Sequence, residues 1–268
     1  MAAKRRDSSM KICVLGSGSA GNCTYIATAK ARILVDLGFG RRSLGRRLQQ
    51  VGLSLDGLDA LLLTHEHTDH VSGVPALVRD LEVPAFMTGG TLRESPALQE
   101  VDRTMIVPVG VPFQIGDLEV EALPVSHDAA QPVGFRFAAD GIQGLLATDL
   151  GEPTPEITEP LADCDWLILE SNHDEEMVLA GPYPWLLKQR LMGPKGHLSN
   201  HALGRCLQTH LGDRTRHIFL AHMSRTNNHP QLALEQISAA LSGASGSGES
   251  GPRVHLTHQN RPSIVLSL

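Results

Sequence analysis

The sequence has few aromatic residues, few cysteines and no long apolar run, and each shortage excludes a class of protein. Aromatic residues make up only 4% of the 268 residues, so the core must be built mainly from aliphatic side chains. No run approaches the roughly 18 apolar residues of a membrane span, so we expect no membrane partner. The four cysteines form no CxxC pair and no disulfide framework, which is typical of reduced thiols in a cytoplasmic protein.

Excess positive charge is also lacking. The formal net charge of -6 argues against a broad electrostatic grip on nucleic acid, although a local patch or bound cations could offset it. Residues 1–9 are basic and polar with no apolar segment behind them, so they predict a disordered tail and not a signal peptide. We expect residues 10–268 to form a single domain with a flexible Gly- and Ser-rich insert at about residues 242–251.

Histidines are abundant, and three of the 13 lie with an aspartate in one short stretch. His65, His67, Asp69 and His70 follow residues 60–63, an apolar run that predicts a buried strand. His65 and His67 should point the same way from extended backbone, and Asp69 falls where a helix could begin. Imidazole and carboxylate are ligands of zinc, with manganese and iron as further candidates. Four ligands so close in sequence cannot all reach one tetrahedral ion comfortably, which suggests two metals.

The N-terminal glycines imitate a nucleotide-binding motif. Gly16, Gly18 and Gly21 fit the GxGxxG pattern, and Asp36 follows at about the expected spacing. A dinucleotide-binding unit needs a helix directly after the glycines. Residues 23–28 and 32–36 instead predict two antiparallel strands, with no room for a helix between them. We therefore expect no nucleotide cofactor, and we expect the glycines to let the backbone approach a neighbour, such as the active site, closely.

Later predicted strands also end in side chains that can bind metals. His127 follows the strand at residues 118–124, Asp149 follows a hairpin over Asp140 and Gly141, and His222 follows the strand at residues 217–220. Because sites of α/β proteins collect at strand ends, we expect these side chains to converge on the first cluster. The remaining pattern predicts a β meander over residues 105–109, 111–115 and 118–124, and helices at residues 41–51, 90–98, 201–211 and 232–241.

This ordered set resembles the signature of the metallo-β-lactamase superfamily: His65-x-His67-x-Asp69-His70, then His127, Asp149 and His222. The chain is also similar to the WalJ/YycJ-type branch at residues 15–23, 125–129, 147–151, 181–185, 196–200 and 260–262. The resemblance implies an α/β (α+β) fold, specifically a four-layer αββα sandwich with a two-metal site at one edge of its sheets.

The resemblance also implies roles for individual residues. One metal would be held by His65, His67 and His127, the other by Asp69, His70 and His222, with Asp149 bridging them. The ions would be two divalent metals, Zn²⁺ or Mn²⁺, with Fe²⁺ as a further candidate. Glu170 and His197 fall where related phosphodiesterases carry a proton-donating pair, so Asp69, Glu170 and His197 are the expected catalytic residues. From the residues alone, His197 could also be a structural histidine beside a helix cap.

The implied function is a dinuclear metal-dependent phosphodiesterase that acts as a 5′-to-3′ exonuclease on DNA by attack of metal hydroxide on phosphorus. No aromatic platform for stacking single-stranded nucleic acid is evident. The residues that could contact the strand are Ser17, Ser19, Asn22, Lys188, Arg190 and Lys195. Two alternatives stay open: hydrolysis of a small phosphodiester, thioester or lactone, and a non-catalytic regulatory protein that keeps its metal for stability. Metal identity, DNA against RNA, cleavage polarity and oligomeric state are also left open.

Overall fold

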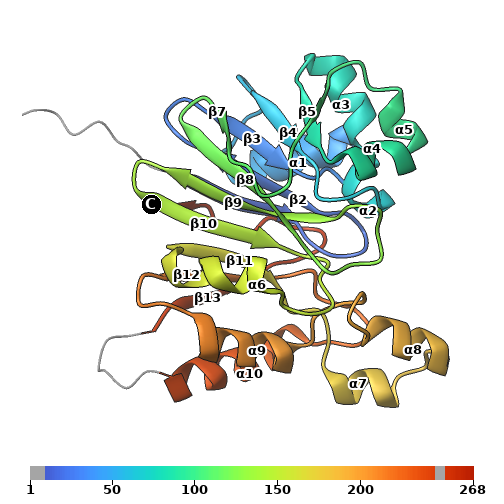
Figure 1. The fold of residues 1–268 in the computed structure, drawn as a ribbon, viewed down its shortest axis with the longest axis vertical. Coiled ribbons are helices and arrows are strands. Elements are labelled where there is room, and N and C mark those ends of the chain that lie inside the picture. Colours follow the sequence, from blue (N-terminus) through green and yellow to red (C-terminus); the bar gives the residue numbers. More distant parts are fainter. Residues whose placement is uncertain (1–9, 245–250) are drawn as a thin grey trace, which may run out of the picture.

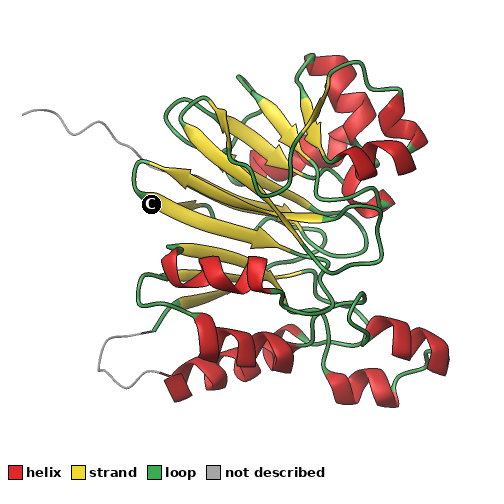
Figure 2. Cartoon of the chain, in the orientation of Figure 1, coloured by secondary structure: helices red, strands yellow, loops and turns green. Residues whose placement is uncertain are grey.

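A computed structural model describes residues 10–244 and 251–268, which form two β-sheets packed face to face between outer layers of helices (Figures 1 and 2). The expected tail at residues 1–9 lies outside the described residues. Of the insert expected at about residues 242–251, residues 245–250 also lie outside the described residues. Residues 242–244 are not an insert, because they form the end of helix α10 (Pro230–Ala244). Within the described ranges, no helix is long and apolar enough to cross a membrane.

The first sheet has the strand order β14-β1-β2-β3-β4-β5-β6. Its strands are β1 (Lys11–Gly16), β2 (Cys23–Ala27), β3 (Arg32–Val35), β4 (Ala60–Leu62), β5 (Ala85–Met87), β6 (Thr104–Ile106) and β14 (Leu266–Ser267). Neighbours from β14 to β3 are antiparallel, and neighbours from β3 to β6 are parallel. The antiparallel pairing of β2 with β3 confirms the two adjacent strands that argued against a dinucleotide-binding unit.

The second sheet has the order β13-β12-β11-β10-β9-β8-β7. Its strands are β7 (Phe113–Ile115), β8 (Leu118–Pro124), β9 (Val133–Ala139), β10 (Ile142–Ala147), β11 (Trp166–Glu170), β12 (His217–Ala221) and β13 (Arg253–Leu256). It is antiparallel from β7 to β10 and parallel from β10 to β13. Both sheets therefore combine an antiparallel half with a parallel half.

Helices cover the outer face of each sheet (Figure 2). Over the first sheet lie α1 (Arg41–Gln50), α2 (Thr68–Val71), α3 (Val74–Leu81), α4 (Gly89–Glu94) and α5 (Pro96–Gln99). On the side of the second sheet lie α6 (Pro155–Thr158), the 3-10 helix η1 (Glu159–Asp163), α7 (Glu175–Ala180), α8 (Trp185–Leu191), α9 (Asn200–His210) and α10.

The layered arrangement follows from strands that are apolar on both faces. In β1, Ile12 and Val14 face the core between the sheets, whereas Cys13 and Leu15 face the core under the helices. This alternation is the period of two of a β-strand, and burial of both faces requires a layer on each side. The expected four-layer αββα sandwich is confirmed.

Two local predictions are wrong. Residues 105–109, 111–115 and 118–124 form no meander, because β6 joins the first sheet, while β7 and β8 belong to the second. The chain has reached the second sheet by Val109, which pairs with Ala122 of β8, and Gly110 follows with a φ of 74° that suits glycine. The helix expected at residues 90–98 is broken at Ser95, since a residue before proline favours extended backbone. A helix does begin near Asp69, as expected, and it is divided into α2 and α3.

Candidate metal centre

The predicted metal-binding side chains come from helix α2 and from the loops that follow four strands, and they lie close together. His65 and His67 follow β4, and Asp69 and His70 lie on α2. From the second sheet, His127 follows β8, Asp149 follows β10 and His222 follows β12. The parallel strands β4, β10 and β12 all present their carboxyl ends here, so residues far apart in sequence converge.

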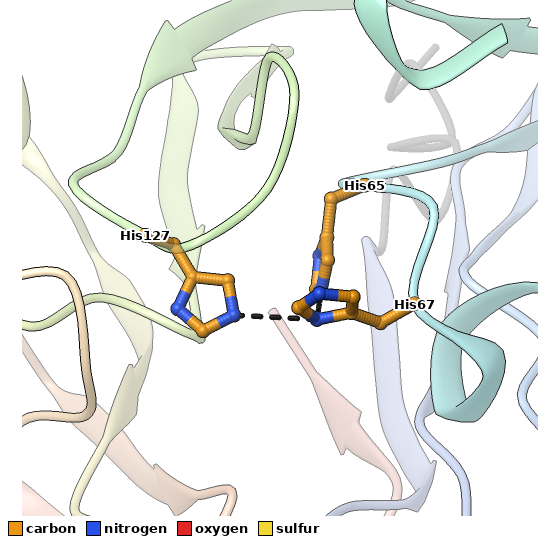
Figure 3. A group of neighbouring side chains, drawn as sticks. All are labelled: His65, His67 and His127. Carbon is orange, nitrogen blue, oxygen red and sulfur yellow. Dashed lines mark hydrogen bonds between the residues drawn. The ribbon is translucent and has the colours of Figure 1, made fainter. Parts of the chain in front are cut away.

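His65, His67 and His127 form the first group (Figure 3). His65 Nε2 lies 2.9 Å from His67 Nδ1, and His127 Nε2 lies 3.4 Å from the same atom. His65 and His127 are buried, whereas His67 is partly exposed. Three imidazole nitrogens aimed at one point from two sheets are a suitable donor set for a divalent transition metal.

Asp69, His70 and His222 form the second group, and Asp149 lies between the groups. His222 Nε2 is 3.5 Å from Asp69 Oδ2 and 3.4 Å from Asp149 Oδ1. Asp149 Oδ2 is 3.2 Å from His70 Nε2, and Asp149 Oδ1 is 3.9 Å from His127 Nε2. Asp149 therefore reaches both groups with its two oxygens. The structure brings together all seven predicted ligands, whose role as ligands stays a prediction.

Buried polar atoms indicate that these residues suit a cation. Asp149 Oδ2 and His222 Nε2 are buried without a well-formed hydrogen bond to any described residue. Such orphaned atoms are costly unless another group, such as a metal, satisfies them. Ligands at about 2.0–2.1 Å from a tetrahedral ion lie roughly 3.3 Å apart, which is close to the spacings in both groups. The cluster is therefore able to bind metal ions.

The charges of the cluster point the same way. Burial and the neighbouring His70 lower the pKa of His65 well below its ordinary value, and burial also lowers the pKa of His127. Both imidazoles are thus neutral, as a metal ligand must be. For His70, burial opposes the charged form, but the carboxylates of Asp149 and Asp36 raise the pKa to about 10. Without a metal, protonated His70 neutralises the carboxylates that a cation would otherwise bind.

Asp36 orients His70 from behind, a role that the sequence pattern did not predict. Its Oδ2 lies 2.8 Å from His70 Nδ1 and accepts a hydrogen bond of 2.9 Å from Thr64 Oγ1. Its Oδ1 accepts a 2.9 Å bond from Thr64 N. A carboxylate on the far nitrogen fixes the tautomer and aims the other nitrogen at the site. The available signal was an aspartate that ends the strand beside β4.

The glycine-rich loop approaches the segment after β3, which in turn packs against α2. A Cβ on Gly21 would lie 2.5 Å from the carbonyl oxygen of Gly38, and a Cβ on Gly38 would lie 1.7 Å from the carbonyl oxygen of Asp69, so only glycine fits at either position. Asn22 N donates to the same carbonyl at 2.8 Å, and the Asn22 amide nitrogen lies 2.9 Å from His70 Nε2. These contacts place Asp69 and His70 relative to the loop.

Ser17 has a different position from Ser19. Ser17 is buried, and its Oγ accepts a 2.7 Å hydrogen bond from His222 N, whereas Ser19 is exposed and lines the cavity of the site. Substrate binding by Ser17, Ser19 and Asn22 stays a prediction. Of the three, Ser19 has the access to solvent that direct contact with substrate requires.

Buried Glu170 pairs with half-buried His197 beside the metal-binding groups. Glu170 Oε1 lies 2.8 Å from His197 Nδ1 and 3.0 Å from His222 Nδ1, while Oε2 accepts bonds from Leu150 N and Leu198 N. Burial opposes ionisation of Glu170, yet the two histidines lower its pKa to about 2. Burial lowers the pKa of His197, but Glu170 outweighs it and raises that pKa. Ser199, and not His197, caps helix α9 by accepting from Ala202 N.

Several site residues hold unusual backbone. Asp36, Asp149 and His222 have φ values of 58°, 56° and 52°, a left-handed conformation that non-glycine residues rarely adopt. Each costs on the order of 1–3 kcal/mol and persists because surrounding contacts enforce it. Asp36 and His222 directly follow strands, and Asp149 lies two residues after β10, so the unusual conformation turns each side chain sharply at a strand end.

A cavity of about 240 Å³ opens above these groups. It is lined by the candidate ligands His67, Asp69, His127, Asp149 and His222, and also by Leu187, Arg190, Lys195 and His197. Of the three cations predicted to line a track, Arg190 and Lys195 reach the cavity. Lys188 is buried and its Nζ donates to Leu179 O at 2.6 Å, away from the site.

Comparison with known proteins supplies independent evidence. A family model described as "Beta-lactamase superfamily domain" matches residues 31–223. The chain is 36% identical over 228 residues to Exodeoxyribonuclease WalJ of Streptococcus pneumoniae serotype 2 (strain D39 / NCTC 7466), covering 83% of this chain and 85% of the relative. It is 34% identical over 231 residues to Exodeoxyribonuclease YycJ of Bacillus anthracis, covering 85% and 88%.

A solved structure shows the same fold. The metallo-beta-lactamase fold protein YhfI from Bacillus subtilis matches with a TM-score of 0.73 and 17% sequence identity, covering 97% of this chain and 100% of that chain. At that identity the likeness concerns the arrangement of strands and helices alone.

Proposed function

Because this chain belongs to the beta-lactamase superfamily domain family, as its resemblance implied, we propose that it is a metal-dependent 5′-to-3′ exonuclease acting on DNA. The observation that carries the proposal is the convergence of seven histidine and aspartate side chains from both sheets at one cavity. Relatives that share most of the chain bear the name exodeoxyribonuclease, which supports DNA as the substrate. The four free, buried cysteines support a reducing location such as the cytoplasm.

Two divalent ions fit the donor set, with Zn²⁺ or Mn²⁺ preferred and Fe²⁺ as a further candidate. His65, His67 and His127 would hold one, Asp69, His70 and His222 the other, and Asp149 would bridge them. When bound, such ions activate water and neutralise the charge of a phosphoryl group. Asp69 would act in catalysis by helping to hold a metal ion that places the reacting phosphate.

His197 would donate the proton that the leaving alkoxide needs. Its Nδ1 is held by Glu170, so its Nε2 is free for the substrate, and its side chain is 25% exposed at the cavity. The raised pKa favours the protonated imidazole, which is the form that a general acid requires. Glu170 positions His197 and favours its protonated form, while backbone amides hold the other carboxylate oxygen of Glu170 in place. Proton donation of this kind contributes roughly 10²–10⁴-fold to rate.

The small volume of the cavity supports a small ester as an alternative substrate. The cavity of about 240 Å³ is smaller than the roughly 300–1,000 Å³ of sites that enclose whole ligands. It can take one phosphodiester group of a strand end, but it equally suits a small phosphodiester, thioester or lactone. Chromogenic small esters tested beside DNA separate the two.

The decisive experiment uses metal-free protein reconstituted separately with Zn²⁺ and Mn²⁺. Each form is incubated with 5′- and 3′-labelled single- and double-stranded DNA. His67→Ala removes one candidate ligand, and His210→Ala, on the exposed end of α9, is the matched control. We expect stepwise loss from the 5′ end in wild type and His210→Ala, and at least a hundredfold loss in His67→Ala with its fold intact.

Full activity of His67→Ala would refute the metal centre as the site of reaction. Cleavage of small esters without cleavage of DNA would replace the nuclease with the small-ester hydrolase. Folded, metal-loaded protein that hydrolyses none of these substrates would favour the non-catalytic alternative.

A further inference from the structure

One wall of the cavity carries cations whose position the sequence pattern only suggested. Helix α8 presents Leu187, Arg190 and Leu191 to the cavity, and Lys195 follows in the loop that leads to His197. The opposite charge is provided by Asp69 and Asp149, which line the same cavity. Cations beside a site for phosphoryl chemistry are placed to meet the phosphate groups of a substrate.

Lys195 is held in place by its backbone. Its carbonyl oxygen accepts a 3.1 Å hydrogen bond from Asp128 N, and the neighbouring carbonyls of Pro194 and Gly196 contact Ser126 Oγ at 2.7 Å and His127 Nδ1 at 3.1 Å. A Cβ on Gly196 would lie 2.1 Å from Leu191 O, so this loop also packs tightly on α8. Lys195 is therefore anchored at a fixed distance from a candidate metal ligand and from the proton donor.

The side chain of Lys195 has no competing partner. It is exposed, and no carboxylate lies within 4.0 Å of its ammonium in the part of the chain that the structure describes. Arg190, by contrast, is paired with Asp128 at 2.5 Å. An unpaired ammonium beside an acidic cavity attracts an anion. The guanidinium of Arg190 lines the same cavity, and its planar shape suits a phosphate.

We propose that Lys195, assisted by Arg190, binds a phosphate of the DNA strand next to the bond that is cleaved. The inference rests on the proposed function, and it adds how this site holds its substrate. The phosphate is either the 5′-terminal phosphate or an internal one. Because the cavity has room for one phosphodiester beside the metal-binding residues, a neighbouring phosphate of the strand would lie near the exposed Lys195, which lines the same cavity. Lys195 is a binding residue and takes part in no bond cleavage.

The test measures binding apart from turnover. Metal-free protein is titrated into a short 3′-fluorescein-labelled single-stranded oligonucleotide that carries either a 5′-phosphate or a 5′-hydroxyl, at several salt concentrations. Lys195→Ala is compared with Lys30→Ala, which removes the same charge from the exposed turn between β2 and β3, at the opposite end of the first sheet.

For Lys195→Ala we expect Kd to rise roughly tenfold, the low end for loss of a charge-assisted hydrogen bond in an exposed position. The slope of log Kd against log salt should fall by about 0.7 for one lost phosphate contact to a single strand. Lys30→Ala should change neither quantity. A loss confined to the 5′-phosphorylated strand identifies the terminal phosphate, and an equal loss on both strands identifies an internal one.

Turnover and stability measurements exclude a merely structural role. With metal-loaded protein, Lys195→Ala should raise KM for DNA and leave kcat within about threefold, Lys195→Arg should restore KM, and the thermal midpoint should not change. An unchanged Kd and salt slope in Lys195→Ala, while wild type degrades DNA, would overturn this inference alone. A wild-type protein that neither binds nor degrades DNA would overturn the proposed function and the inference together.

Discussion

Ser17 illustrates how a residue that cannot touch a metal still shapes the site. His222 is in the left-handed conformation, and both of its backbone groups are held by side chains. Its N–H donates to Ser17 Oγ at 2.7 Å, and its carbonyl oxygen accepts from Asn172 Nδ2 at 2.7 Å. Because the conformation is unfavourable by itself, these two bonds are what enforce it.

We expect Ser17→Ala to destabilise the protein and to misplace His222. The buried N–H of His222 would lose its acceptor, which typically costs about 1–3 kcal/mol of the free energy of unfolding. Urea denaturation measures that loss, and a metal titration of the folded variant should show weaker binding. Ser19→Ala, on an exposed side chain of the same loop, is the control and should do neither. Equal stability of the two variants would contradict this role of Ser17.

The lowered pKa of Glu170 predicts how the stability of the protein depends on pH. Its pKa is lowered from 4.5 to about 2, mainly because His197 and His222 oppose the effect of burial. Between those values the unfolded chain binds the proton and the native protein does not, so acidification favours unfolding. The stability that Glu170 provides is present above about pH 4.5 and is lost as the pH falls toward 2.

Replacing Glu170 by glutamine should therefore flatten the acid dependence of the metal-free protein. Urea unfolding between pH 5 and pH 3 should show a slope smaller than that of wild type by at most about 1.4 kcal/mol per pH unit, the effect of one proton. Glu94→Gln, an exposed carboxylate on α4, should keep the wild-type slope. Equal slopes of unfolding free energy against pH for Glu170→Gln and wild type would show that the Glu170 carboxylate is not the source of the acid dependence.

At the scale of helices and strands, the sequence predicted the features that depend on neighbouring residues alone. The limits of β8 and the hairpin over Asp140 and Gly141 were predictable, because alternation and turn residues are properties of neighbouring residues. The sheet that β6 joins was not, because strand pairing depends on distant contacts. The split of the predicted helix at Ser95 shows that one proline can outweigh an apolar pattern.

The residues of the candidate site likewise include some that local sequence features identify and others that depend on distant contacts. Its histidines were found because their residue type and spacing report metal chemistry directly. Asp36, Ser17 and Asn172 act through hydrogen bonds to residues that are 34, 205 and 50 positions away. A single sequence does not identify such partners, since aspartate, serine and asparagine are common at strand ends and turns for local reasons.

Two glycines in different elements should respond oppositely to alanine. Gly144 on β10 pairs with Trp166 on β11, and a Cβ there would lie 1.9 Å from the buried indole ring. Gly45 lies within α1, and nothing surrounds its added Cβ within 4 Å. Gly144→Ala should cost about 1–3 kcal/mol or more through overpacking, whereas Gly45→Ala should gain roughly 0.4–1 kcal/mol from helix propensity and a less flexible unfolded chain.

Thermal or urea unfolding of the two variants beside wild type tests this pair. A stable Gly144→Ala would mean that β10 and β11 can separate at that position, which would contradict the packing of Trp166. A destabilised Gly45→Ala would mean that the outer side of α1 is covered and not open.

At the scale of the whole molecule, the candidate metal centre joins the two sheets. His65, His67, Asp69 and His70 come from the first sheet, and His127, Asp149 and His222 come from the second. Ions held by both sets would act as cross-links near one edge of the interface between the sheets. A ligand that binds only the native state stabilises the entire cooperative unit, and not one loop.

Metal should therefore raise the stability of the molecule as a whole. At a free metal concentration of 100 times Kd, the free energy of unfolding should rise by about 2.7 kcal/mol for one site. The thermal midpoint should rise by roughly 5–10 °C in a chain of this size. His67→Ala and His127→Ala remove ligands from opposite sheets, yet both should lose this increment when Zn²⁺ is added to metal-free protein, while His210→Ala keeps it. If only one of them lost it, the ion would be held by a single sheet, and the two halves of the site would not be coupled through the metal.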